Sequence, residues 1–273
     1  MTKVGIIAGS GSLPLIIGRS LIDKKIEVCF FCIKNFCENN HFKEFENIEI
    51  ELNSLSNILN SLNQKKINKI VMAGNITRPS LKDIKFDLST ISLIKNYLLE
   101  SKGDDQLLKT ISNFFLKNGF PLFDWKSFCP ELFSNKDNLS NLFPSKKAIN
   151  NMKKGLKIFE IIGKADIGQS LIIQNELVLG VECIEGTDQL IKRCYNLKKD
   201  GDKGILIKLS KYLQHSNLDV PTIGLETLKQ INQYNFEGVF IEKNNCVILE
   251  KEKMINYCNQ NNLFLSTLNK IEK

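Results

Sequence analysis

The chain has 273 residues, of which 42% are hydrophobic and 25% are charged. This length is comfortable for two compact domains, and the balance of residues argues against disorder along the whole chain. The net charge is +7, but the basic residues are scattered without interleaved aromatic residues, which disfavours nucleic-acid binding. Lys, Asn and Ile are abundant while Arg is scarce, so drift toward AT-rich codons explains the charge better than an anionic partner does.

No window reaches about 18 apolar residues, and the apolar stretch at the N-terminus is too short for the core of a signal peptide. We therefore predict a soluble, cytoplasmic protein. Most of the eight cysteines lie in apolar runs and are predicted to be reduced core residues, among them Cys29, Cys32, Cys183, Cys194 and Cys246. A zinc site built from Cys29, Cys32, Cys37 and His41 is disfavoured, because residues three apart on a strand point to opposite faces.

Strand and helix patterns alternate along the first half of the chain. Residues 3–8 form an apolar run typical of a buried parallel strand, and apolar residues follow at helical spacing from Leu13 to Leu21. Further strands are predicted at 26–33 and 67–73, and further helices at 55–62, 89–101 and 104–118. Because successive strand–helix units build a parallel sheet, this alternation predicts a Rossmann-like α/β domain.

The second half begins after a stretch without periodicity, and we interpret residues 131–145 as a linker. A helix at 148–163 is followed by two strands, 170–174 and 177–184, joined by Asn175-Glu176 as in a hairpin. The remaining predicted elements are a helix at 187–197, a strand at 204–209, a helix around Ile231, strands at 238–241 and 247–249, and a final helix and strand. The sequence thus predicts an N-terminal Rossmann-like domain at 1–130 and a distinct C-terminal α/β catalytic domain at 146–273.

A glycine-rich loop, Gly9-Ser10-Gly11, follows the first strand and precedes a predicted helix with Pro14 in its first turn. Such a loop lets the backbone approach an anion, and the helix N-terminus adds exposed N–H groups. A full dinucleotide fingerprint needs a third glycine and an acidic residue about twenty positions on, and both are missing, so NAD binding is disfavoured. A tight turn without a ligand remains the alternative.

Two more polar loops accompany the predicted N-terminal sheet. The third strand ends in Gly74, and Asn75, Thr77 and Arg78 then supply donors suited to phosphate or sugar oxygens at the sheet edge where ligands bind in open α/β folds. A polar loop without a ligand explains these residues equally well. Asp104 and its neighbour open a predicted helix. Helix capping explains these two acids as well as a binding role does.

Acidic residues gather on two loops of the second half. Glu182, Glu185 and Asp188 lie at a strand–helix junction, and Asp219 precedes a proline at a strand entry. Hard divalent cations prefer carboxylate oxygens, so acids from separate loops predict a cation site, although a single such loop is more often a cap or a surface charge. The sequence contains no HExxH, Walker A or GxSxG motif, and two histidines are too few for a di-metal phosphoesterase site.

Taken together, these loops resemble the UDP-2,3-diacylglucosamine pyrophosphatases of the LpxI type, a family of the lipid A pathway. The matching segments keep the family's order along nearly the whole chain. They are IIAGSGSLP at 6–14, AGNITRP at 73–79, KGDDQLL at 102–108, ADIGQ at 165–169, VECIEGTDQLIKR at 181–193 and LDVPTIG at 218–224.

The resemblance implies a Rossmann-like domain and a distinct α/β domain that hold the substrate between them. It implies that water attacks the pyrophosphate and releases UMP and 2,3-diacylglucosamine 1-phosphate (lipid X), with Mg2+ or Mn2+ as cofactor. The family's essential aspartate falls on Asp219, the expected catalytic residue. Expected substrate-binding residues are Ser10, Gly11, Gly74, Asn75, Thr77, Arg78, Asp104, Gln169, Thr187 and Lys208, and expected metal ligands are Asp219, Glu182, Glu185 and Asp188.

One stretch departs from the family. The family usually continues its Lys-containing strand into a Lys-Pro-x-Gln-Asp-x-Arg-like segment, whereas residues 208–217 read KLSKYLQHSN. Either the phosphate contact that the family makes from this segment is made here by Lys208, Lys211 or His215, or substrate affinity and activity are altered. A non-catalytic nucleotide-sugar or lipid sensor of the same fold is therefore the alternative function, and a nicotinamide oxidoreductase is disfavoured. A homodimer and peripheral contact with the inner membrane stay open.

Overall fold

The computed structural model describes residues 2–37, 39–76, 91, 104–165, 167–210, 218 and 220–270, with the backbone alone at 39, 40, 104–107 and 164. It separates into two compact units, one formed by Met1–Cys129 with Asn217–Asp219 and the other by Pro130–Ser216 with Val220–Lys273. Each unit has its own sheet and its own hydrophobic core. None of the described helices is long and apolar enough to cross a bilayer.

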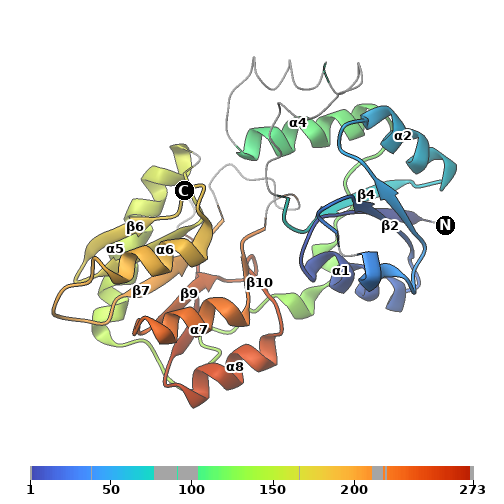
Figure 1. Cartoon of the computed structure of the whole chain (residues 1–273). Coiled ribbons are helices and arrows are strands. Elements are labelled where there is room, and N and C mark those ends of the chain that lie inside the picture. The colour runs from blue at the N-terminus through green and yellow to red at the C-terminus, as the bar shows by residue number, and fades with distance from the viewer. Residues whose placement is uncertain are drawn as a thin grey trace. The chain divides into compact units, whose positions relative to one another are not determined.

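A four-stranded parallel sheet forms the centre of the N-terminal unit (Figure 1). The strands, in spatial order, are β3 (Asn47–Ile50), β2 (Glu27–Ile33), β1 (Lys3–Ala8) and β4 (Lys69–Ala73). The two central strands are almost wholly buried and read as continuous apolar runs, as strands covered on both faces do. Their carboxyl ends therefore share one edge, where the glycine-rich loops begin.

Helices cover both faces of this sheet. On one face, α2 (Leu55–Gln64) and α4 (Asp104–Lys117) bury Leu62 and Phe115 against strand residues that include Phe31. On the other face lies α1 (Leu13–Asp23), which approaches so closely at Gly18 that a Cβ there would meet the Phe30 ring at 2.2 Å. The Rossmann-like outline predicted from the sequence is confirmed.

The sheet of the C-terminal unit has five strands and a mixed direction. In spatial order they are β11 (Phe264–Leu268), β9 (Gly238–Glu242), β7 (Ile205–Lys208), β5 (Ser170–Gln174) and β6 (Leu177–Val181). The first three are parallel to one another, and β5 is antiparallel to both of its neighbours. The predicted hairpin is confirmed, with Asn175 and Glu176 both at positive φ, as a two-residue type I′ turn requires.

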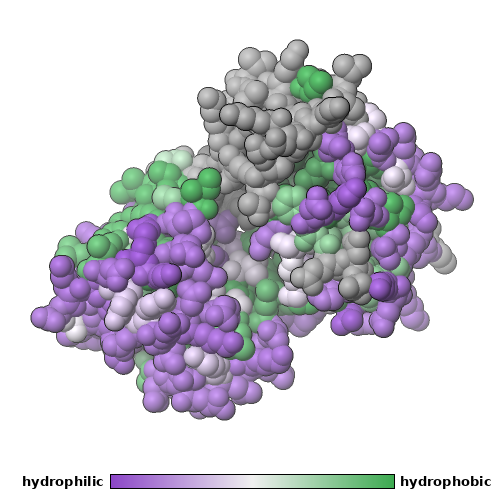
Figure 2. Space-filling model, viewed as in Figure 1, coloured by the Kyte–Doolittle hydropathy of each residue, from purple (hydrophilic) through white to green (hydrophobic). Residues whose placement is uncertain are grey.

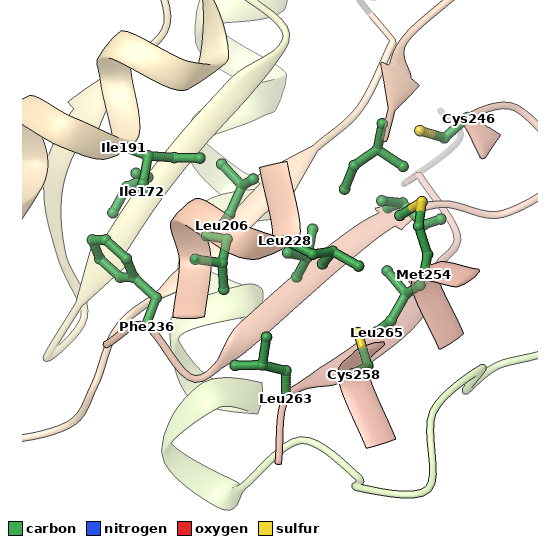
Figure 3. Packing of buried hydrophobic residues seen from close by; sticks show 14 of the residues in the cluster. Ile172, Ile191, Leu206, Leu228, Phe236, Cys246, Met254, Cys258, Leu263 and Leu265 are labelled. Carbon is green, nitrogen blue, oxygen red and sulfur yellow. The ribbon is translucent and has the colours of Figure 1, made fainter. Parts of the chain in front are cut away.

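The helices of the C-terminal unit divide between the two faces of its sheet (Figure 1). Of the described helices, the long helix α5 (Lys146–Ile162) is the one that packs on one face. Three helices cover the other face, namely α6 (Gly186–Tyr195), α7 (Leu225–Gln233) and α8 (Lys251–Gln260). Figure 3 shows this second core, in which Leu228 and Met254 from the helices meet Leu206 and Leu265 from the strands. Both layers therefore stabilise the sheet by removing apolar side chains from water.

Some elements differ from the sequence-based expectations. The strand β3 was not predicted, and it joins the sheet at the outer edge of β2. The short strand β10 (Val247–Ile248) does not pair with β9, its neighbour in sequence, but with β8 (Thr222–Ile223) in a separate two-stranded sheet. The predicted helix at 89–101 lies outside the described residues, apart from residue 91.

The stretch interpreted as a linker is hydrogen-bonded to the C-terminal unit. Leu139 N–H donates to the Leu265 carbonyl over 2.8 Å, and Thr267 N–H donates to the Asp137 carbonyl over 2.9 Å. Asn138 also pairs with Ser266 in an isolated antiparallel bridge. Residues 137–139 thus lie along the outer edge of β11.

The cysteine prediction needs one correction. Cys29, Cys32, Cys194 and Cys246 are buried, as predicted, but Cys183 is exposed because it lies in the loop after β6 and not within that strand. The predicted strand extended to residue 184, whereas β6 ends at Val181.

Candidate functional site

The two glycine-containing loops of the N-terminal unit are joined to each other. Ser10 N–H donates to the Asn75 carbonyl and Asn75 N–H donates to the Ser10 carbonyl, each over 2.9 Å, so that the residues form an antiparallel bridge. The Ser10 hydroxyl donates to the same Asn75 carbonyl over 2.9 Å. The loops after β1 and β4 therefore form one continuous surface at the carboxyl edge of the sheet.

The glycine at the start of the second loop makes this junction possible. Gly74 has φ of +91°, where a side chain is strained, and a Cβ there would lie 2.7 Å from the Ser10 carbonyl oxygen. Gly11 also has φ of +91°, but an added Cβ would meet nothing within 4 Å. The backbone at Gly11 is thus open to a ligand, beside the start of α1, whose Ser12 N-cap makes no side-chain cap.

A buried cluster in the C-terminal unit brings a lysine and two hydroxyl groups together. Lys208, the last residue of β7, donates from Nζ to Thr187 Oγ1 over 2.6 Å and to Ser170 Oγ over 3.3 Å. The two hydroxyl oxygens are 3.2 Å apart. Only 8% of the Lys208 side chain is exposed, so this ammonium group is held almost out of water, where its charge acts strongly on any anion that reaches it.

Glu182 completes the cluster from the loop after β6. Its Oε1 accepts a hydrogen bond from the Thr187 hydroxyl over 2.8 Å, which uses the threonine hydrogen, so Ser170 must donate to Thr187. The other oxygen, Oε2, lies 3.9 Å from Lys208 Nζ and has no hydrogen-bond partner among the described residues although it is buried. The cluster therefore keeps an unsatisfied anionic oxygen beside an ammonium group.

Strand pairing explains why these residues meet. Ser170 opens β5 and lies directly opposite Lys208 in the antiparallel pair with β7. Glu182 N–H donates to the Ser170 carbonyl over 2.8 Å, which fixes the loop after β6. The backbone at Gly168 can approach the loop after β6 this closely only because it has no side chain, since a Cβ at this residue would lie 2.0 Å from the Glu182 carbonyl oxygen. Sequence reasoning missed Ser170, since a lone serine at a strand start belongs to no motif.

The other two acids of this loop have different surroundings. Glu185 forms an ion pair with Arg193, whose Nη2 lies 2.7 Å from Oε1. Burial works to raise the pKa of Glu185, but the hydrogen bonds and charge of Arg193, together with backbone hydrogen bonds, outweigh it, and the pKa lies below its usual range. Asp188 stands in the first turn of α6. Burial raises its pKa, and the nearby Lys208 opposes that rise.

A second polar network lies beside the cluster, where β7, β9 and β11 end. Ser210 N–H donates to Glu242 Oε2 over 2.6 Å, and Lys270 Nζ donates to the Ser210 carbonyl over 2.7 Å. Asn245 Nδ2 donates to Glu242 Oε1 over 3.0 Å. No sequence motif indicated this network. It anchors the chain at Ser210, the last described residue before the 211–217 stretch that departs from the family pattern.

The remaining predicted site residues are placed only in part. Gln169 directly precedes β5, and its carbonyl accepts from Leu209 N–H over 2.9 Å. Asp219, Thr77 and Arg78 lie outside the described residues, and of Asp104 only the backbone at the start of α4 is described. Within the described part of the chain, no group of three or more His, Cys, Asp or Glu residues is arranged to hold a metal ion.

These features define a two-unit α/β protein with a joined pair of glycine loops at one sheet edge and a buried Lys-hydroxyl cluster in the second unit, both suited to an anionic ligand. Two family models match it, the LpxI N-terminal domain over residues 3–132 and the LpxI C-terminal domain over residues 135–266. The chain therefore belongs to the LpxI family. The protein named UDP-2,3-diacylglucosamine pyrophosphatase LpxI of Caulobacter vibrioides is 25% identical to it over 272 residues, which covers 97% of each chain.

Proposed function

We propose that the protein hydrolyses the pyrophosphate bond of UDP-2,3-diacylglucosamine, the substrate named for its Caulobacter relative, in the synthesis of lipid A. Water would add its oxygen to one phosphorus and the bridging P–O bond would break, releasing UMP and 2,3-diacylglucosamine 1-phosphate. The observation that carries this proposal is the buried Lys208 ammonium, held by Thr187 and Ser170 within a family match that spans both units.

Lys208 and Thr187 would bind the pyrophosphate. A buried ammonium group offsets the negative charge of phosphoryl oxygens, and its effect is larger than in water because little solvent screens it. A phosphate oxygen that entered the cluster would take the place of Glu182 Oε2 as the third partner of Lys208. In the N-terminal unit, the open backbone at Gly11 and the loop at Asn75 would bind phosphate or sugar oxygens.

The assignments of Gln169, Thr77, Arg78 and Asp104 to substrate binding rest on the family resemblance. These residues lie in the matching segments 165–169, 73–79 and 102–108. We propose the same roles for them here, with Gln169 supported further by its place one residue before Ser170.

A divalent cation, Mg2+ or Mn2+, is proposed as the cofactor, and the residues fit it in part. Glu182 has an unsatisfied carboxylate oxygen and Asp188 adds a second carboxylate, the ligand chemistry that such cations prefer. Glu185 does not fit, because Arg193 already neutralises it. Asp219 would have to complete the site. When bound, the cation would neutralise phosphoryl charge and lower the pKa of coordinated water.

Asp219 is proposed as the catalytic residue that orients the attacking water. The test is release of UMP from UDP-2,3-diacylglucosamine dispersed in nonionic detergent, with Mg2+ or Mn2+ and with chelator, for wild type and Asp219→Asn. Metal-dependent release that falls at least about a hundredfold in the variant is expected. Asp200→Asn, in a loop of the C-terminal unit, is the matched control and should keep full activity.

Either of two outcomes would overturn the proposal. If the Asp219→Asn enzyme is as active as wild type, the proposed catalytic role of Asp219 is refuted. A folded wild-type protein that binds the substrate without releasing UMP would point to the sensor function. We further propose that the protein works in the cytoplasm, and a homodimer stays a prediction.

A further inference from the structure

The exposed face of α5 carries only basic charges. Its five exposed lysines are Lys146, Lys147, Lys153, Lys154 and Lys157. The one acid of the helix, Glu160, is half-buried, and the opposite face is buried through Ala148, Asn151, Gly155 and Phe159. None of the five lysines forms an ion pair with a described residue. We call these five side chains the basic face of α5.

Compositional drift does not explain this face. Drift toward lysine would enrich all helices alike, yet the three helices on the opposite side of the same sheet mix their charges. Glu226 stands beside Lys229 on α7, and Glu252 stands beside Lys253 on α8. On α6, Asp188 accompanies two basic residues. Each of the four helices carries one acid, but α5 sets five lysines against it whereas the other three carry at most two basic residues each, although the chain as a whole holds 30 acidic residues against 37 basic ones.

Large hydrophobic side chains are exposed at both ends of the basic face. Phe143, just before the helix, is 72% exposed and Ile161, in its last turn, is 71% exposed. Ile149 lies between them and is also exposed. Figure 2 shows hydrophobic side chains at the surface of this unit near β6 and α5. Basic charges flanked by exposed aromatic and aliphatic side chains are typical of a surface that rests on a bilayer.

We propose that the basic face of α5 docks the protein on an anionic phospholipid surface. The lysines would contact the phosphate headgroups, and Phe143 and Ile161 would reach the boundary of the acyl chains. Charge complementarity selects an anionic partner, and the exposed apolar side chains select a bilayer over a nucleic acid. The choice of a bilayer also rests on the proposed function, because a substrate with two acyl chains resides in a membrane.

Cosedimentation with vesicles tests the proposal. The full-length protein is mixed with vesicles of phosphatidylcholine alone or of phosphatidylcholine with phosphatidylglycerol, and the bound fraction is measured at low and high salt. Binding is expected only to the anionic vesicles, and it should weaken as salt screens the lysines. Each lysine near such a surface changes partition about fivefold, so Lys153→Gln/Lys154→Gln/Lys157→Gln should bind about a hundredfold less.

The matched control removes the same charge from the other side of the sheet. Lys192→Gln/Lys229→Gln/Lys253→Gln takes one exposed lysine from each of α6, α7 and α8. It should bind the anionic vesicles like wild type. If both triple variants lose vesicle binding equally, net charge alone drives binding and the proposal is refuted. Failure of the wild-type protein to bind anionic vesicles would also refute it. Equal thermal melting of the two variants and wild type shows that neither loss is due to unfolding.

Two further measurements separate this surface from the proposed function. In detergent micelles without a bilayer, the α5 triple variant should release UMP at the wild-type rate, since its lysines lie outside the site. Vesicle binding by a protein that never releases UMP would refute the proposed function and leave the docking surface standing. An RNA oligomer that binds as tightly as the anionic vesicles, and loses binding with the same triple variant, would replace the bilayer as partner.

Discussion

The ion pair between Lys208 and Glu182 can be tested by a double-mutant cycle on stability. The charged atoms are 3.9 Å apart, which corresponds to about 4 kcal/mol at an effective dielectric constant of about 20. Lys208→Met leaves the Glu182 carboxylate buried and uncompensated, and Glu182→Gln leaves the ammonium group alone. Each single change should cost about 3 kcal/mol, the low end for a broken buried pair, because 13% of the Glu182 side chain is still exposed.

The double variant should lose less than the sum of the two single losses. When both charges are removed, no buried charge is left without a counter-charge, so we expect a coupling energy of about 1–3 kcal/mol. Urea unfolding followed by far-UV circular dichroism measures the stabilities. The protein has a single tryptophan, Trp125, which belongs to the N-terminal unit. Tryptophan fluorescence therefore reports that unit, and a loss confined to the C-terminal unit should leave the fluorescence transition unchanged.

An exposed pair in the same unit supplies the control. Lys229 and Glu226 are 3.3 Å apart on α7, but 51% and 68% of their side chains are exposed, so the same cycle should give a coupling of at most about 0.5 kcal/mol. If the Lys208 and Glu182 losses add to within about 0.5 kcal/mol, the two charges do not interact in the folded protein and the reasoning is refuted.

Two other predictions concern the loops and the thiols. Gly74→Ala should destabilise the N-terminal unit by about 2–3 kcal/mol, because the new Cβ would clash with the Ser10 carbonyl oxygen and the residue would also be strained by its positive φ. Gly119→Ala, at φ of +88° with nothing within 4 Å, should cost about 1 kcal/mol, and equal losses in tryptophan-monitored unfolding would contradict the close approach. Among the thiols, iodoacetamide at mildly alkaline pH should label the exposed Cys183 first. Burial raises the pKa of Cys29 and of Cys194 to about 11, so early labelling of either one, seen by peptide mass spectrometry, would contradict their burial.

The sequence predicted the elements with strong patterns and not their pairing. The predicted strand at 3–8 is confirmed as β1, and the predicted helix at 104–118 agrees with α4 to within one residue. The strand β3 was missed because Asn47–Ile50 is short, half-exposed and carries a charge, as edge strands often do. That β10 pairs with β8 could not be foreseen, because the partners are 25 positions apart in the register of Val247 with Thr222.

For the candidate site too, the sequence predicted individual residues and not how they pair. Loop chemistry singled out Glu182, and the family resemblance named Lys208 and Thr187, but only the antiparallel register of β5 with β7 shows that Ser170 joins them. The ion pair with Arg193 likewise had no signal in the sequence, and it holds Glu185 although Glu182 and Thr187 are close to it along the chain. Side-chain direction at a strand–helix junction depends on the exact residue at which the helix begins, which a pattern fixes only to within a few residues.

The bridge between Ser10 and Asn75 makes two distant parts of the chain a single exchangeable piece. A chimera that takes only residues 9–12 from a relative would place new side chains against the old backbone at Gly74, and one that takes only residues 74–76 would meet the same difficulty from the other side. In the proposed function these loops bind phosphate or sugar oxygens, so a change of substrate preference made through them should require both loops to be replaced together, although they are encoded at two separate places in the gene.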